Sequence, residues 1–495
     1  MLLKGRYDPF AELALAATTG RSGPWEKLID SRHSERGLLS TRQLNVLNTT
    51  GGTMKAHNKV AYSLMSIASM LLSPVSLAES TGAIARPIVL KAAHLFDSVS
   101  GNLLDHGVIV VSGSRIQAVG SDAKIPADAQ IIDLGSATLL PGFIDAHVHL
   151  SDESGANWYL DFYSEIMRFP AEQALYGAHY AKVTLEAGVT TVRDLGSDDF
   201  IALGLRNAIR AGMIPGPRML VANSAIGSTG GHADQDPYPP ERIAVAGPIK
   251  GVCNGPEECR AAVRYQMKYG ADVIKFMPSG GVLSLSDPVD NPQLTQGEMN
   301  AIVSEAHSWG RKVAAHCHGD RAAKMAIAAG VDSIEHGTFL QDDTLAEMRK
   351  KHVYLVATLF AGVWGLEHID KFPPPIAAKA RAAAAQAQQM FQHAVRIGVP
   401  IAMGTDAAVE PHGLNAREFS LMAKNGLSPA QALIAGTAGG ADLLGLSDQI
   451  GTLTVGKLAD IVAVAGNPLA DLKTTEHVVF VMKEGTVYVG AAPTR

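Results

Sequence analysis

The chain has 495 residues, 47% of them hydrophobic, which is enough for one large barrel or for two to three ordinary domains with apolar cores. The formal net charge is −6, charged residues make up 18% of the chain, and no long run of Lys or Arg occurs. A nucleic-acid partner is therefore not expected, because such proteins carry a basic patch or stripe. The composition predicts a globular, soluble protein.

Residues 54–78 contain the three parts of a secretory signal peptide. Residues 54–59 are basic, 60–72 are mostly apolar, and 76–78 are small residues ahead of Glu79. The alternatives are an amphipathic or buried helix and a membrane anchor, although the apolar run is short for spanning. We expect residues 1–53 to be an upstream, non-native extension. The mature protein is then periplasmic or secreted, and it has no membrane contact after processing.

The β-rich runs lie at the two ends of the remaining chain. Short apolar runs separated by Gly, Asp and Ser turns fill residues 88–134, and a matching set fills residues 458–489. We predict one small β-sandwich, assembled from residues 84–140 and 441–495.

Between these ends, residues 141–440 alternate apolar strand-like runs with helical patterns. Eight parallel strands with helical crossovers predict an α/β fold, a (β/α)₈ TIM barrel. Residues 223–251 lack clear periodicity and are expected to form a long binding loop. The strand candidates are 137–150, 188–196, 218–226, 271–277, 312–319, 333–337, 353–360 and 400–407, and three of the helical patterns are 259–270, 295–310 and 375–398.

The three cysteines are too few for a disulfide framework. Cys253 and Cys259 are close in sequence and could pair in an oxidising compartment, and free thiols are the alternative. Cys317 lies between two histidines on a strand candidate, so it should face the opposite side and belong to the core.

Histidines and an aspartate lie at the carboxyl ends of several strand candidates, the face on which barrel enzymes build their sites. His147 and His149 are two residues apart on one strand and therefore point the same way, as do His316 and His318. A single strand-end histidine is commonly structural, but the joint pattern favours divalent metal ions. His336 and Asp406 are the two other strand-end residues in this pattern. Zinc is the first choice, and manganese, cobalt and iron are alternatives.

Lys275 ends the fourth strand candidate amid apolar residues. An unpaired buried lysine is costly, so a snorkelling or salt-bridged core lysine is one interpretation. The other interpretation is a lysine that reacts with carbon dioxide. The resulting carbamate is an anionic oxygen ligand that can bridge two metal ions.

The mechanism that we expect uses two divalent ions sharing a hydroxide, with one ion polarising the scissile carbonyl. Asp406 would act as general base and then as general acid toward the leaving amine. His147 and His149 would bind the first ion together with Asp406. His316 and His336 would bind the second ion, with carboxylated Lys275 between the two.

The segments PGFIDAHVHL, GVTTVRDLG, GADVIKFMPSGG, VAAHCHG, SIEHGT and MGTDA together resemble the amidohydrolase superfamily, from about Pro87 to the end of the chain. They are most similar to its binuclear, carboxylated-lysine subgroup of prolidase-like, carboxypeptidase-like and ochratoxin-hydrolysing enzymes. The resemblance implies cleavage of dipeptides or N-acyl amino acids, with ochratoxin A-type amides included, and often a homo-oligomer. It places the metal ligands on His147, His149, Lys275, His316, His336 and Asp406.

The same resemblance implies that His316 coordinates metal while His318 faces the substrate. His232 matches a Gly-Gly-His segment of the subgroup and is the second candidate for substrate binding. For both residues a purely structural role is the alternative.

Two other functions compete with this one. A cyclic-amide hydrolase or deaminase of the same superfamily is the first, although deaminases usually lack the lysine on strand four. A non-catalytic barrel that binds a partner is the second, and the full ligand set argues against it. The sequence does not predict the acyl group or the amino acid recognised.

Overall fold

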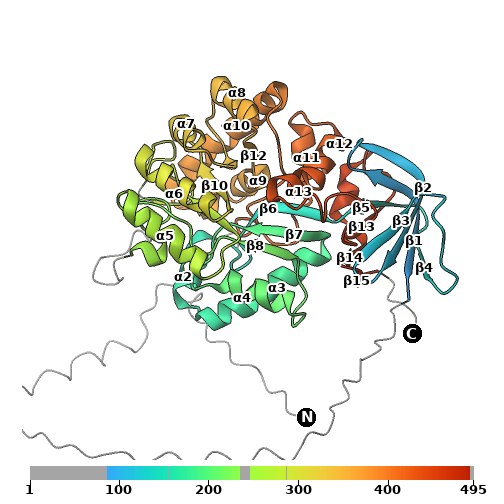
Figure 1. Ribbon diagram of the computed structural model, residues 1–495. Helices are drawn as coiled ribbons and strands as arrows, with labels where there is room; N and C mark the ends of the chain where they lie inside the picture. Colours follow the sequence, from blue (N-terminus) through green and yellow to red (C-terminus); the bar gives the residue numbers. More distant parts are fainter. Residues whose placement is uncertain (1–85, 155–156, 235–245, 286, 491–495) are drawn as a thin grey trace, which may run out of the picture. The chain divides into compact units, whose positions relative to one another are not determined.

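The computed structural model describes residues 86–154, 157–234, 246–285 and 287–490 (Figure 1). The predicted extension (1–53) and signal peptide (54–78) lie outside these residues. The described residues all belong to one compact unit. Within the described ranges, no helix has both the length and the apolarity needed to cross a membrane.

The two ends of the described chain share one mixed sheet, seen in Figure 1 where β1–β4 lie beside β13–β15. The strand order is β15-β14-β13-β5-β1-β2-β3, with β4 pairing with β1. The two ends meet where β5 runs antiparallel to β13, with Leu140 opposite Val462. The strands are β1 (Ile88–Asp97), β2 (Asn102–Ser112), β3 (Arg115–Val119), β4 (Gln130–Asp133), β5 (Ala137–Pro141), β13 (Ile461–Ala465), β14 (Val478–Lys483) and β15 (Thr486–Val489).

One face of this sheet buries an apolar cluster that includes Leu90, Ile109, Leu139, Ile461 and Phe480. Alternating side chains from both ends of the chain supply this cluster, since successive residues of a strand face opposite ways. The two β-rich ends therefore assemble together. The structure assigns their strands to a single sheet, so the two-layered sandwich stays a prediction, as do its boundaries.

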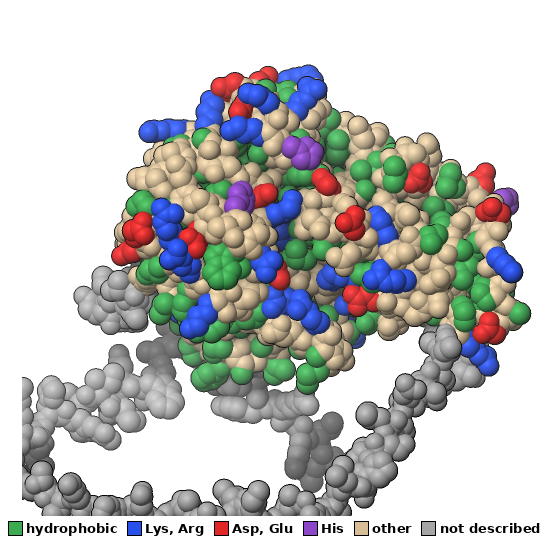
Figure 2. Space-filling view, viewed as in Figure 1, with side chains coloured by type: hydrophobic (Ala, Val, Ile, Leu, Met, Phe, Trp, Pro, Cys, Tyr) green, Lys and Arg blue, Asp and Glu red, His purple; other side chains and the backbone are tan. Residues whose placement is uncertain are grey.

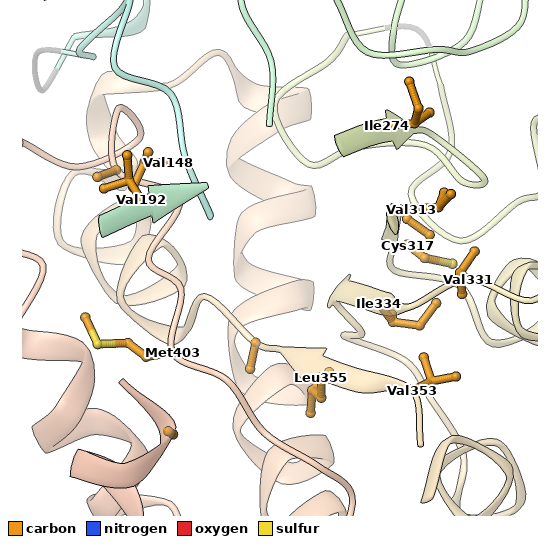
Figure 3. Packing of buried hydrophobic residues seen from close by; sticks show 14 of the residues in the cluster. Val148, Val192, Ile274, Val313, Cys317, Val331, Ile334, Val353, Leu355 and Met403 are labelled. Atoms are coloured by element: carbon orange, nitrogen blue, oxygen red, sulfur yellow. The ribbon is translucent and has the colours of Figure 1, made fainter. Parts of the chain in front are cut away.

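Seven parallel strands form two further sheets in the centre of the chain, in the orders β6-β7-β8 and β12-β11-β10-β9. Their apolar side chains pack into a continuous core in which Val148, Ile274 and Ile334 take part (Figure 3). These strands are β6 (Phe143–Val148), β7 (Val189–Asp194), β8 (Arg218–Val221), β9 (Val273–Phe276), β10 (Lys312–Cys317), β11 (Ser333–His336) and β12 (Tyr354–Val356).

Residues 400–407 differ from the expected eighth strand. They make two isolated parallel bridges instead, Leu355 to Ile401 on the β12 side and Val148 to Ala407 on the β6 side. A regular ladder is interrupted because Asp406 has a left-handed backbone, with φ of 70°. A third parallel bridge joins Ile226, after β8, to Phe276 of β9. The result is a TIM-barrel-like α/β fold, but the strands assigned in the described residues do not close into a barrel.

The predicted helices form where their sequences favour them. A capping box of Thr295 and Glu298 starts α6, and α10 has prolines in its first turn and ends at Gly398 with φ of 83°. The helices are α2 (Trp158–Met167), α3 (Pro170–Glu186), α4 (Ile201–Arg210), α5 (Pro256–Lys268), α6 (Gln296–Ser308), α7 (Asp320–Ala329), α8 (Asp342–Lys351), α9 (Leu359–Glu367), α10 (Pro374–Ile397), α11 (Arg417–Lys424), α12 (Pro429–Ala435) and α13 (Ala438–Leu444), with 3₁₀ turns η2 (Pro248–Lys250), η3 (Ile369–Lys371) and η4 (Leu472–Glu476).

Of the two alternatives for Cys253 and Cys259, a disulfide or free thiols, the structure has the disulfide. Cys253 and Cys259 form a disulfide across the start of α5. Cys317 is free and fully buried on β10, where its sulfur packs in the apolar core of Figure 3. It faces away from the histidines on either side of it, as strand alternation predicts.

Candidate active site

The side chains predicted to form the site line one cavity of about 640 Å³. Most of them lie at or just after the carboxyl ends of the central strands, because parallel strands bring their ends to one face. All eight predicted residues are present in the lining: His147, His149, His232, Lys275, His316, His318, His336 and Asp406.

Asp406 lies between His147 of β6 and His149, which follows this strand. Its Oδ1 atom lies 3.3 Å from Nε2 of His147 and 3.3 Å from Nε2 of His149. Burial would raise the pKa of Asp406, but the three nearby imidazoles, with that of His147 the strongest, hold it well below its ordinary value. Asp406 is therefore a carboxylate with an oxygen between two imidazole nitrogens.

The Lys275 side chain is 1% exposed, and its Nζ atom lies 3.3 Å from Nε2 of His147. Burial lowers the pKa of this amine to about 8, against the opposing charges of Glu335 and Asp406. The snorkelling interpretation is therefore wrong, because the amine is enclosed with the histidines. Its neutral form is readily accessible, since burial disfavours the ammonium.

A second group consists of His316 of β10, His318 just after it, and His336 of β11. Nε2 of His336 lies 2.9 Å from Nδ1 of His316, and the rings of His318 and His336 stack with centroids 4.8 Å apart. Threonine hydroxyls hold the outer nitrogens: Nδ1 of His336 lies 2.7 Å from Oγ1 of Thr358, and Nδ1 of His318 lies 2.7 Å from Oγ1 of Thr338.

Among the described residues, two sets of three potential ligand atoms result, each with all its atoms within 4.8 Å of one another. One set is His147, His336 and Asp406, and the other is His316, His318 and His336. Burial lowers the pKa values of His147 to about 4 and His318 to about 3, and it lowers those of His316 and His336 well below their ordinary value. Neutral imidazoles with a carboxylate suit a divalent cation such as zinc, so the donor set fits the predicted metal ions.

The backbones of His336 and Asp406 are left-handed, with φ of 67° and 70°. Regular strand alternation would send His336 to the face opposite that of Glu335. The left-handed turn instead brings His336 into the cavity, while Glu335 contacts His147 from behind. Such conformations are uncommon outside glycine and concentrate at functional sites.

Glu335 and Arg193 support the site and were not identified from the sequence. Glu335 accepts a hydrogen bond from Nδ1 of His147 at 2.9 Å and pairs with Arg193 at 2.9 Å. Both are buried, and the Arg193 charge together with the hydrogen bond from His147 outweighs desolvation and lowers the pKa of Glu335 to about 2. The available signal was a charged residue within an apolar strand, Glu335 in SIEHG and Arg193 in GVTTVRDLG.

Several aromatic side chains line the cavity. Trp158 and Phe162 of α2 stack with ring centroids 5.1 Å apart, and the ring centroids of Trp364 and His368 are 4.1 Å apart. Arg168 also lines the cavity, with its guanidinium 4.3 Å from the ring centre of Tyr176. On the face of the molecule shown in Figure 2, basic and acidic side chains are mixed and no large single-sign area is visible.

Comparison with known proteins identifies the class. The amidohydrolase family profile matches residues 138–489, so the chain belongs to the amidohydrolase family. It is a hydrolase acting on C–N bonds, similar to the prolidases and to ochratoxinase.

The similar proteins are matched over most of their length. Ochratoxinase from Aspergillus niger is 32% identical over an alignment of 413 residues that covers 79% of this chain and 84% of that protein. A solved Xaa-Pro dipeptidase with bound methionine in the active site is 38% identical, with a TM-score of 0.78, over 82% of this chain and 100% of that one. A prolidase complexed with N-methylphosphonate-L-proline is 31% identical, with a TM-score of 0.74. The match covers 81% of this chain and 99% of that one.

Proposed function

We propose that the protein is a binuclear metal-dependent amidohydrolase that cleaves the amide bond of N-acyl amino acids or dipeptides. The observation that carries this proposal is the enclosure of Lys275 with His147, His149 and Asp406, beside the His316–His336 pair. A one-metal site needs no buried lysine among its ligands, whereas a two-metal site needs an anionic bridge.

The predicted ligands divide into two groups around the lysine. His147, His149 and Asp406 would hold one divalent ion, and His316 and His336 the other, with modified Lys275 between them. When bound, the ions would activate a water molecule and polarise the scissile carbonyl. His336 belongs to both sets of potential ligand atoms, which supports closely spaced ions.

The modification of Lys275 requires its neutral amine. The ammonium would first lose one proton, and the neutral nitrogen would then attack the carbon of carbon dioxide. An N–C bond forms as one C–O π bond breaks onto oxygen, and a second proton leaves the nitrogen. A buried cation thereby becomes an anionic oxygen ligand, which removes the cost of enclosing an ammonium beside imidazoles.

Asp406 would perform the proton chemistry. Its Oδ1 atom faces the imidazoles of His147 and His149, and the carboxylate lines the cavity. It would take a proton from the attacking water and deliver it to the leaving amine nitrogen, so that the amine departs neutral. Glu335 would keep His147 oriented throughout, because a carboxylate on the outer nitrogen fixes the tautomer of a ligating histidine.

The shape of the cavity supports a substrate with a bulky apolar group. The stacked Trp158 and Phe162 of α2 and Trp364 of α9 are part of its lining, and flat apolar surfaces favour rings and branched chains. The relatives act in this chemical class: one is named for Xaa-Pro dipeptides and one for ochratoxin. His232 and His318 are the proposed substrate contacts, because both lie in the lining with half-buried or buried rings.

The proposal is tested by a substrate screen. The zinc-loaded protein is incubated with N-acyl amino acids, Xaa-Pro and other dipeptides and ochratoxin A, and released amino acid is measured. Release from at least one of these classes is expected. Hydrolysis of cyclic amides or deamination of nucleobases alone would instead favour the alternative within the superfamily.

We further propose export through residues 54–78. The Cys253–Cys259 disulfide supports this, because such bonds persist in oxidising compartments. Expression from Met54 in a bacterial host should yield a periplasmic protein whose first residue is Glu79. A protein that stays in the cytoplasm and still begins at Met54 would contradict export.

Assembly into a homo-oligomer is also proposed, with α2 at the interface. Its outer face exposes seven large apolar side chains together with the start of α3, on the order of 800 Å², which is about what each partner buries in a standard interface. They are Tyr159, Leu160, Tyr163, Ile166, Met167, Phe169 and Leu175. Light scattering should show an assembly that Tyr163→Glu dissociates, and a wild-type monomer would contradict this.

A further inference from the structure

The segment that follows β9 contacts two histidines of the site. The carbonyl of Gly280 lies 3.2 Å from Nε2 of His316. Gly281 packs against the ring of His232 so closely that a Cβ atom on it would lie 2.0 Å from Cε1. The position of this backbone therefore determines where the His232 ring can sit.

Lys379 of α10 reaches this segment from the other side. Its Nζ atom donates to the carbonyl oxygens of Gly281 at 3.1 Å and Ser284 at 2.9 Å, and to that of Asp287. It also lies 3.4 Å from Oδ1 of Asp287. The Lys379 side chain is only 17% exposed, so one ammonium gathers three backbone carbonyls away from most of the solvent.

The polar contacts of His232 lead back to the same segment. Its Nδ1 atom lies 3.2 Å from Oγ of Ser284, and its backbone N–H donates to Oε1 of Gln293 at 2.9 Å. Ser284 donates to Oδ1 of Asp287, and Gln293 donates to Oδ2 of Asp287 at 2.8 Å. Asp287 thus links both partners of His232 to Lys379.

We propose that Lys379 is a positioning residue for substrate recognition, which fixes His232 by clamping the backbone of Gly281, Ser284 and Asp287. The inference rests on the proposed function, in which His232 contacts the substrate. The physical reason is that buried carbonyls without a donor are costly, so the segment adopts the one arrangement in which all three reach the ammonium. Because α10 is a 24-residue helix, it provides a rigid support for the clamp.

The experiment compares Lys379→Met with Arg381→Met, an exposed residue on the same helix. In the zinc-loaded full chain, Lys379→Met should lower kcat/KM roughly 10- to 100-fold, mainly through KM, with zinc content unchanged. Arg381→Met should resemble the wild type. Ser284→Ala, which removes only a hydroxyl, should also raise KM. It replaces Lys379→Met in this test if that variant does not fold.

Two further readouts separate positioning from general stability. In a His232→Ala background, adding Lys379→Met should cause little further loss, because the two residues act through one contact. Amide hydrogen exchange in residues 279–285 should accelerate in Lys379→Met, and this readout needs no substrate. Unchanged exchange would overturn the clamp even if amide hydrolysis is found. If exchange is faster but the losses of kcat/KM from the two substitutions add fully in the double variant, the link between Lys379 and His232 is overturned.

Discussion

Nδ1 of His147 donates to Oε2 of Glu335 at 2.9 Å, in a contact that is buried on both sides. The other oxygen of Glu335 pairs with Arg193, whose guanidinium also donates to the Ala146 carbonyl at 2.6 Å. The guanidinium therefore neutralises a carboxylate that would otherwise be isolated in the core. The outer nitrogen of His147 is thereby occupied, and Nε2 is left facing the cavity.

Glu335→Gln should weaken metal binding roughly 10- to 100-fold, because the amide cannot supply the charge that orients His147. It should also destabilise the fold by about 3 kcal/mol or more, since Arg193 remains buried without its anion. Zinc titration and denaturant unfolding measure the two effects. Glu347→Gln on the surface of α8 is the matched control, with an expected change within about 0.5 kcal/mol. If the two variants bind zinc and unfold alike, Glu335 supports neither metal binding nor the stability of the fold.

Lys275→Ala should abolish turnover and reduce the bound metal, because the proposed bridging ligand is lost. Reconstitution provides a sharper test: stripped wild-type protein should regain activity with zinc much faster when bicarbonate is present. Lys324→Ala, at an exposed lysine of α7, should behave like the wild type in both assays. Full activity of Lys275→Ala, or reactivation indifferent to bicarbonate, would speak against the carbamate.

Asp406→Asn keeps the size of the side chain but removes its basicity. We expect kcat to fall by roughly 10²- to 10⁴-fold, the usual contribution of a positioned general base. The comparison variant is Asp448→Asn at an exposed position. Metal content is measured in parallel, since Asp406 is also a proposed ligand. Retained metal with lost turnover assigns it the proton chemistry, whereas retained metal with near-normal turnover would refute that role.

Thiol counting tests the cysteine arrangement. The unfolded, unreduced chain should react with an alkylating reagent only at Cys317, and all three cysteines should react after reduction. In the folded protein Cys317 should be inert, because burial raises the pKa of its thiol far above the ordinary value. Labelling of Cys253 and Cys259 without a reductant would show that they do not pair.

Much of the candidate site could be proposed from the sequence, because its residues follow strand periodicity. His147 and His149, or His316 and His318, face one way whatever the details of packing. Lys275 was recognisable as a cation in an apolar strand. The eighth strand was not predicted correctly, since the left-handed conformation of Asp406 has no signal in the sequence when the residue is not glycine.

The supporting residues were harder to find for a physical reason. Glu335 precedes His336, so regular alternation would place only one of them near the site. The positive φ of His336 makes both available. The contacts of Lys379 were equally hidden, because they join α10 to backbone oxygens nearly 100 residues away, and carbonyl groups carry no sequence signature.

The central claim is that these residues form a two-metal site that hydrolyses amides. The most direct test measures the zinc content per chain and amino-acid release from N-acyl amino acids and dipeptides, in the same preparation, before and after chelation. We predict two zinc ions per chain, turnover that disappears with the metal, and recovery of both on adding zinc with bicarbonate. A protein that binds no metal, or one whose amide hydrolysis survives complete metal removal, would contradict the claim.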